Sequence, residues 1–121
     1  MSKKILIVDD DKDILDALQE LLEGEGYLTE IAKNGMVALE VLGKMGALPD
    51  LILLDYMMPE MDAPAFRSAQ GLDPRISSIP ILLMTADDHI DAKQVQLGAR
   101  GCIKKPVKLD AFLALVVECL K

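Results

Sequence analysis

Four groups of side chains in this sequence could act together on a charged substrate. Three aspartates stand in a row at positions 9–11, and Asp55 directly follows the apolar run LILL. Thr85 follows the run PILLM, and Lys105 and Pro106 follow GCIK. Each group therefore follows a short apolar segment, which is the position where a buried strand ends.

These residue types suit the handling of a phosphoryl group. Crowded carboxylates repel one another, and a hard divalent cation that takes oxygen ligands relieves this repulsion. Mg²⁺ fits best, because it prefers one or two carboxylates together with waters and phosphate oxygens. Lys105 and Thr85 would hold the remaining phosphoryl oxygens. The residues therefore predict a phosphoryl-transfer site, where the protein supplies positioning and charge neutralisation.

Strands and helices that could position these groups alternate along the chain. Continuous apolar runs and short β-rich segments predict strands, and apolar residues at helical spacing predict helices. The predicted strands cover 4–8, 27–31, 51–54, 80–84 and 101–104. The predicted helices cover 14–22, 37–42, 63–71, a segment that Asp87 and Asp88 would cap and that ends near Gly98, and 109–120.

Strict alternation of strands and helices predicts an α/β fold. We expect a three-layer, doubly wound sandwich in which a parallel five-stranded sheet carries helices on both faces through right-handed crossovers. In such folds the chemistry lies outside the carboxyl ends of the strands. The groups named above would therefore meet at one edge of the sheet.

Composition limits the remaining choices. The length of 121 residues predicts a single domain covering 1–121. The net charge of −7 is unevenly placed, since residues 1–60 hold five basic and thirteen acidic side chains. This balance argues against nucleic acid and an anionic membrane surface as partners. The apolar runs are too short to cross a bilayer and no signal-peptide core is present, so we expect the cytoplasm.

Metal chemistry based on cysteine and histidine is not expected. Cys102 and Cys119 match no zinc-ligand spacing, and His89 is the only histidine. Small apolar packing roles suit both cysteines, and an exposed structural role suits His89.

Four motifs occur in a fixed order: VDDDKD (8–13), LLDYMMPEMD (53–62), MTA (84–86) and IKKP (103–106). With them the whole chain resembles the receiver domain of two-component response regulators. The resemblance implies a flavodoxin-like (βα)5 sandwich with strand order 2-1-3-4-5. It also implies a phosphorelay signalling switch whose phosphoryl donor is a sensor histidine kinase or a histidine phosphotransfer protein.

The resemblance assigns Asp55 as the phosphoacceptor, whose carboxylate attacks the phosphorus of a phosphohistidine. Asp10 would bind Mg²⁺ (or Mn²⁺) directly, and Asp9 would do so directly or through water. Asp55 itself and the backbone carbonyl of Met57 complete the implied metal ligands.

The same resemblance gives Lys105 the role of neutralising the phosphoryl group and Thr85 the role of reporting its arrival. The backbone amides of Tyr56 and Ala86 would add hydrogen bonds. The Lys105–Pro106 peptide would be constrained, and cis as in the family, which favours Lys105 over Lys104 as the inward lysine.

One of the departures from the family pattern concerns the relay of the signal. Cys102 stands where an aromatic side chain usually couples to the threonine, so a large aromatic rotation is not available there. Signal relay through the fifth strand, and with it the choice of partner, is therefore expected to differ from that of most relatives.

We expect the chain to act as a switch rather than as an enzyme with an external substrate. It ends at Lys121, just after the last predicted helix, so output would be contact with an unknown downstream protein unless the chain is part of a longer regulator. A homodimer is left open.

Other interpretations are weaker. The acidic run at 9–11 could simply cap the first helix, and a receiver could act as a scaffold without phosphorylation. An aspartate-nucleophile phosphatase needs a second aspartate where Met57 stands. A flavin or nucleotide module needs a phosphate cradle, whereas DDDKD would repel the ligand.

Overall fold

The computed structural model describes residues 2–121, in which five strands and five helices alternate. The strands are β1 (Lys4–Val8), β2 (Leu28–Ala32), β3 (Leu51–Asp55), β4 (Ile81–Thr85) and β5 (Gly101–Lys104). The helices are α1 (Lys12–Gly24), α2 (Gly35–Lys44), α3 (Ala63–Gly71), α4 (Ile90–Leu97) and α5 (Leu109–Cys119). All strand pairs are parallel, in the order β2-β1-β3-β4-β5, which is the predicted fold and strand order.

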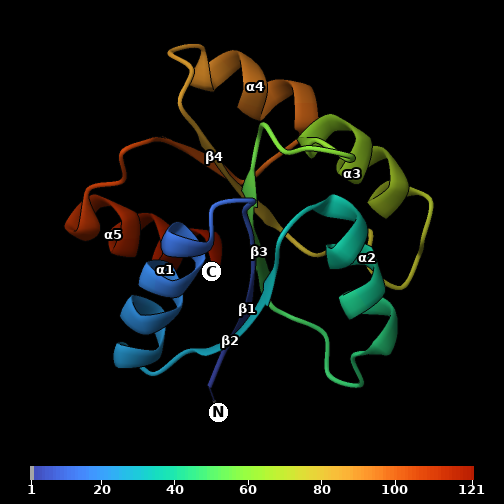
Figure 1. Cartoon of the computed structure of the whole chain (residues 1–121), viewed down its shortest axis with the longest axis horizontal. Helices are drawn as coiled ribbons and strands as arrows, with labels where there is room; N and C mark the ends of the chain where they lie inside the picture. The colour runs from blue at the N-terminus through green and yellow to red at the C-terminus, as the bar shows by residue number, and fades with distance from the viewer. Residues whose placement is uncertain (1) are drawn as a thin grey trace.

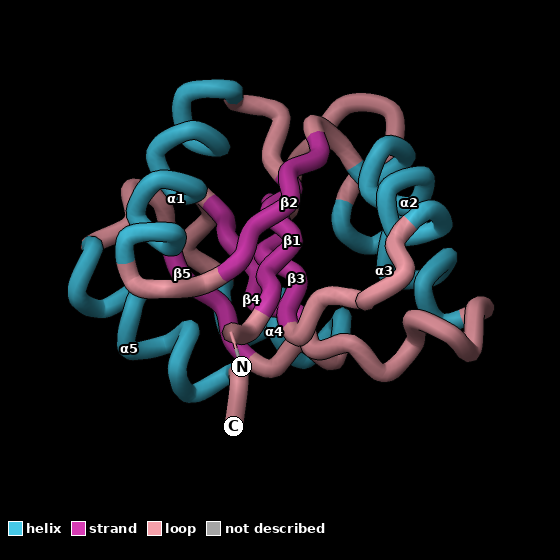
Figure 2. Tube along the Cα trace, turned by 90° about the horizontal axis from the view of Figure 1, so that it is seen from below, coloured by secondary structure: helices cyan, strands magenta, loops and turns pink. Residues whose placement is uncertain are grey.

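Helices cover both faces of the sheet. Figure 1 shows α1 and α5 on one side of the strands and α2 and α3 on the other, and Figure 2 shows the strands running between these two layers. Side chains that alternate along each strand divide between two cores. Ile5, Ile7, Leu51 and Leu53 pack with α1 and α5, whereas Leu6, Val8, Ile52 and Leu54 pack with α2, α3 and Leu97 of α4.

Three helices begin with a side chain that accepts hydrogen bonds from the first backbone N–H groups. Asp11 does so for α1, Asn34 for α2 and Asp62 for α3. The carboxylate or amide oxygen in each case satisfies a donor that the helix leaves unpaired. The capping role weighed for the 9–11 run therefore falls on Asp11.

The predicted cap of α4 is wrong. The N-cap residue is His89, which makes no side-chain cap bond. Asp87 lies too far upstream, and its Oδ1 instead accepts a bond of 2.8 Å from the His89 backbone N–H. The predicted end is confirmed, since Gly98 is the C-cap residue with φ of 62°, a left-handed conformation that glycine adopts without strain.

Two strands begin one residue later than predicted. Tyr27 donates its backbone N–H to the Leu22 carbonyl, so it closes the end of α1 and β2 begins at Leu28. Pro80 precedes β4 and contributes only its carbonyl, which accepts from the Ile52 N–H at 3.0 Å. Thr85 is consequently the last residue of β4.

All three arginines of the chain bind carbonyl groups at the C-terminal ends of helices. The pairs are Arg67 with Leu97 of α4, Arg75 with Leu42 of α2, and Arg100 with Cys119 of α5. A guanidinium in this position satisfies free carbonyls and favours the negative end of the helix dipole. The three guanidinium groups therefore stabilise helix ends.

No helix in residues 2–121 has both the length and the apolar character needed to cross a bilayer.

Candidate functional site

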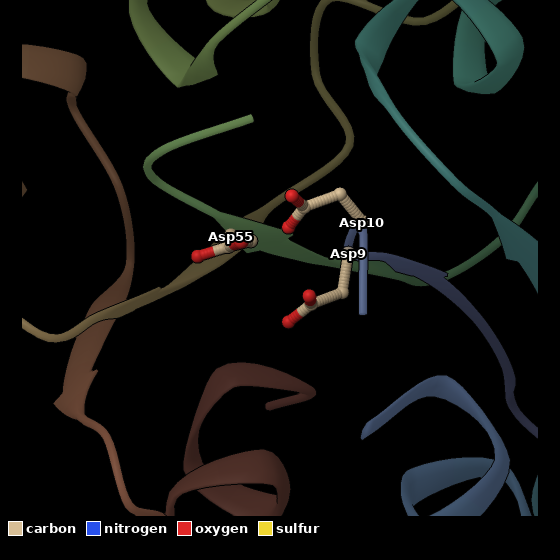
Figure 3. A group of neighbouring side chains, drawn as sticks. All are labelled: Asp9, Asp10 and Asp55. Atoms are coloured by element: carbon tan, nitrogen blue, oxygen red, sulfur yellow. The ribbon is translucent and has the colours of Figure 1, made fainter. Parts of the chain in front are cut away.

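Three carboxyl groups meet at the carboxyl ends of β1 and β3. Asp9, Asp10 and Asp55 each offer an oxygen, and these atoms lie within 4.8 Å of one another (Figure 3). Asp9 and Asp55 are buried, whereas Asp10 is exposed. The sheet register places Asp9 beside Asp55, because Val8 pairs with Leu54 and the residue that follows each of them is an aspartate.

The alternation of side chains explains which lysine joins them. Asp9 and Asp55 follow the alternate positions that face α1 and α5, and Ile103 of β5 faces the same layer. Lys105, two residues after Ile103, therefore points to the side of the two carboxylates. Lys104 points the other way and pairs with Asp88.

Lys105 forms ion pairs with both buried carboxylates. Its Nζ lies 2.8 Å from Asp9 Oδ2 and 3.2 Å from Asp55 Oδ1. Asp9 Oδ1 also accepts a bond of 2.9 Å from the Asp11 backbone N–H. One ammonium and one amide thus compensate a cluster that still holds an excess of negative charge.

The environment of Asp55 favours its protonated form. Burial and the negative charge of Asp9 raise the pKa of Asp55 to about 6, with a hydrogen bond to Asp10 acting in the same direction and Lys105 opposing them. Burial alone would lower the pKa of Lys105, but its hydrogen bond to Asp9 and the charges of Asp55 and Asp9 raise it above its ordinary value. The lysine therefore stays charged, and the site favours a further cation.

A pocket of about 260 Å³ opens over Asp55. It brings together residues from the ends of β3, β4 and β5 with one residue of α4. The lining residues are Asp55, Tyr56, Met57, Thr85, Ala86, Asp87, Lys93 and Lys105. The predicted acceptor, threonine, lysine and alanine thus share one cavity, and Met57 lies at its wall with a largely exposed side chain.

The hydrogen bonds of Thr85 and of the Tyr56 amide bear on the roles expected for these groups in the pocket. The Thr85 hydroxyl accepts a bond of 3.1 Å from the Asp87 N–H, and the Thr85 carbonyl accepts from the Lys105 N–H at 2.7 Å. The expectation for the Tyr56 amide is wrong, because this N–H donates to the Met84 carbonyl at 2.8 Å and extends the sheet. Ala86 remains a lining residue.

The Lys105–Pro106 peptide bond is cis, as the resemblance implied. Cys102 is half-buried and packs against the core formed with α2 and α3. Burial raises the pKa of its thiol above the ordinary value.

Sequence reasoning missed a polar cluster beside Asp55. Lys93 of α4 lies 3.3 Å from Asp87 Oδ2, and its Nζ lies 4.4 Å from the centre of the Tyr56 ring. The Tyr56 hydroxyl donates to Gln96 Oε1 at 3.1 Å. No residue spacing in the sequence predicts these contacts, because they depend on where α4 lies against the loops after β3 and β4.

The donor set suits a hard divalent cation. All the candidate ligands are oxygens, and their carboxylates already lie within one coordination sphere's reach of each other. Soft ligands are absent from this cluster, which separates it from zinc or copper sites.

Comparison with known proteins agrees with this geometry. The family described as "Response regulator receiver domain" matches residues 5–117. "Response regulator MprA" of Mycobacterium ulcerans is 35% identical over all of this chain, and the protein of that name from Mycobacterium tuberculosis is also 35% identical. The chain spans about half the length of these relatives, 51% and 52%.

Solved structures give the same result. The chemotaxis response regulator CheY4 of Vibrio cholerae has a TM-score of 0.90 and 30% identity, with 99% of this chain and 100% of that chain covered. The signal receiver domain of a signal transduction histidine kinase from Syntrophus aciditrophicus has a TM-score of 0.86 and 34% identity, covering 98% of this chain and 90% of the other. The chain therefore belongs to the response regulator receiver domain family.

Proposed function

We propose that this chain is a phosphoryl-accepting switch whose acceptor is Asp55. The observation that carries the proposal is the position of Lys105, whose ammonium bridges Asp9 and Asp55 in the pocket that also contains Thr85. A carboxylate beside a fixed cation can act as a nucleophile whose product gains negative charge. If the ion pairs of Lys105 served only to stabilise the fold, no pocket would be needed beside them, so the pocket favours a reactive site.

The proposed reaction is transfer from a phosphohistidine. An Oδ of Asp55 forms a bond to phosphorus while the bond between phosphorus and the imidazole nitrogen breaks, and the imidazole keeps the electron pair and takes a proton from solvent. Lys105 offsets the charge on the phosphoryl oxygens, and Thr85 and the Ala86 amide donate hydrogen bonds to them. Asp55 must be ionised to attack, and with its pKa raised to about 6 a bound cation would extend its ionised form to lower pH.

Receiver domains generally bind Mg²⁺ at acidic residues, and the acidic cluster supports the same cofactor here. Asp9, Asp10 and Asp55, with the backbone carbonyl of Met57, are the proposed ligands of Mg²⁺ or Mn²⁺. When bound, the cation supplies positive charge to both the acceptor carboxylate and the incoming phosphoryl oxygens.

Response regulator receiver domains interact with histidine kinases or phosphotransfer proteins. We propose one of these as donor, a downstream protein as the target of the modified form, and the cytoplasm as the compartment. We also propose that the chain turns over no external substrate, because Met57 occupies the position where a phosphatase needs an acid. A receiver that acts unphosphorylated as a scaffold is the remaining alternative.

The test uses a small acyl phosphate with Mg²⁺ and intact-protein mass measurement. We expect the wild type to gain one phosphoryl group and Asp55→Asn to gain none. Glu60→Gln is the matched control, because it makes the same carboxylate-to-amide change at an exposed position of the following loop and should gain one group. Equal modification of wild type and Asp55→Asn, or modification of neither, would reject the proposal.

A further inference from the structure

Lys93 is held in the wall of the acceptor pocket rather than on the solvent face of α4. Only 16% of its side chain is exposed. Its Nζ lies 3.3 Å from Asp87 Oδ2 and 4.4 Å from the centre of the Tyr56 ring, and Lys93 lines the same pocket as Asp55. An ammonium over an aromatic face is attracted by the ring's negative face, so two separate contacts hold this cation.

Both contacts belong to the loops that carry the site. Tyr56 directly follows the acceptor Asp55, and Asp87 donates its backbone N–H to the Thr85 hydroxyl. The Tyr56 ring is also tied to α4 at a second point, through its bond to Gln96 three residues after Lys93. Lys93 in the middle of α4 and Gln96 in its last turn are thereby bound to residues of the loops after β3 and β4.

Apart from Ile90, which is half-buried, little else holds the N-terminal half of the helix. Leu97, at its far end, is the one buried residue of α4, and Val95 is 82% exposed. Arg67 donates to the Leu97 carbonyl at 2.9 Å, so the C-terminal end is anchored. The N-cap His89 gives no side-chain bond to the first turn. The position of the N-terminal half therefore depends on the polar cluster around Lys93.

Of the two lysines that line the pocket, Lys93 is the one whose ammonium can leave its partner at low cost. Lys105 already pairs with two buried carboxylates. Asp87, the partner of Lys93, is 44% exposed and also accepts bonds from the backbone N–H and ring Nδ1 of His89. If the ammonium of Lys93 moved away, the carboxylate of Asp87 would still be hydrogen-bonded and in contact with water. No buried charge would be left without a partner.

We propose that Lys93 is a positioning residue that couples modification of Asp55 to the position of α4. This inference rests on the proposed function, since it needs a phosphoryl group on Asp55. That group replaces one carboxylate charge by the larger charge of a phosphoryl dianion in the shared pocket. The ammonium of Lys93 turns from Asp87 and the Tyr56 ring to the phosphoryl oxygens, and the N-terminal half of α4 moves with it.

The test loads the whole chain with beryllofluoride and Mg²⁺ as the phosphoryl mimic and follows amide and Tyr56 ring chemical shifts by NMR. We expect loading of the wild type to shift the α4 amides and the Tyr56 ring. Lys93→Met, which keeps the chain length but not the charge, should still load, with the half-loading concentration raised about 2- to 10-fold by the loss of one partly exposed charge. Its α4 amides and Tyr56 ring should lose most of their loading-induced shift.

Two further variants separate coupling from a structural effect. Lys93→Arg keeps the positive charge and should therefore restore the loading-induced shifts. If Lys93 only packed against the helix, the charge of the side chain at this position would not decide the shifts. Lys44→Met removes an exposed lysine at the distant end of α2 and should behave as wild type.

The outcomes are distinguishable. If the wild type does not load, the proposed function fails and this inference fails with it. If the wild type loads and Asp55→Asn does not, the proposed function stands. If Lys93→Met then shows the full wild-type shifts on loading, or cannot be loaded at saturating beryllofluoride, the positioning role alone is overturned.

Discussion

Lys105 Nζ lies 3.2 Å from Asp55 Oδ1, although the two residues come from different strand ends with β4 between them in the sheet. The same ammonium lies 2.8 Å from Asp9 Oδ2, a residue 96 positions away along the chain. The strand alternation that turns these side chains to one face places the ammonium of Lys105 beside Asp55, the proposed acceptor, independently of any metal ion. This arrangement links stability, pH response and reactivity at one site.

Replacing Lys105 should expose the repulsion between the carboxylates. Lys105→Met leaves Asp9 and Asp55 without their cation, so we expect the free energy of unfolding to fall by roughly 1–3 kcal/mol without divalent ions. Urea unfolding measures this loss. Added Mg²⁺ should shrink the difference, because it neutralises the same carboxylates.

Lys104→Met is the matched control for this experiment. Lys104 pairs with Asp88 outside the site, where the side chains are 50% and 81% exposed. Exposed pairs contribute little, so we expect a change below about 1 kcal/mol and no dependence on Mg²⁺. Equal losses for the two lysine variants would contradict the account of the site.

Removing the charge of Asp55 should stabilise the metal-free protein at neutral pH. Its pKa is about 6 in the folded protein against an ordinary 3.8, so folding binds the proton more tightly and the ionised form costs stability. Asp55→Asn should raise the free energy of unfolding by roughly 1–4 kcal/mol well above pH 6.

The gain should decrease as pH falls through 6 and vanish below 3.8, where Asp55 is protonated in both states. Urea unfolding over a pH series in chelator gives the curve. The exposed change Glu60→Gln should show no such pH dependence. A destabilised Asp55→Asn protein across the whole range would disprove the charge argument.

Proton and metal should compete at the same carboxyl group. Below pH 6 the apparent Mg²⁺ affinity should fall by about tenfold per pH unit while one proton is displaced. Calorimetric titration at several pH values tests this, and Asp55→Asn should bind more weakly without that pH dependence. Affinity that stays constant through pH 6 would place the metal elsewhere.

The arginine bonds at helix ends should contribute measurably to stability. Arg100 Nη1 donates to the Cys119 carbonyl at 2.9 Å and to the Lys121 carbonyl at 3.4 Å, so Arg100→Met should cost roughly 1–2 kcal/mol in urea unfolding. Lys121→Met removes only an exposed pair with Glu118 and should change stability by less than about 0.5 kcal/mol. A silent Arg100→Met variant would show that water replaces the guanidinium without loss.

Much of the site could be predicted because it follows from strand ends. Asp9, Asp55, Thr85 and Lys105 each end or follow a strand, and a parallel sheet must bring those ends together. Period-two alternation then turns Lys105 rather than Lys104 toward Asp55. Both the meeting of the strand ends and the direction of Lys105 follow from the positions of apolar runs, which can be recognised in the sequence.

The errors lie where backbone hydrogen bonds decide. Tyr56 looked like a free amide donor, but β3 continues one bond further and uses it. Asp87 looked like a helix cap, but its carboxylate binds His89 and the helix starts later. Lys93 drew no attention, because its contacts depend on how α4 lies against two loops and not on helical periodicity.

In the proposed reaction the carboxyl group of Asp55 alone takes up the phosphoryl group. To test this, the Mg²⁺-loaded protein is treated with a small acyl phosphate. Borohydride then reduces the aspartyl phosphate formed on the protein, and peptide mass spectrometry locates the reduced residue. We expect reduction at position 55 alone. Reduction at Asp9, Asp10 or Asp11, or at no position, would contradict it.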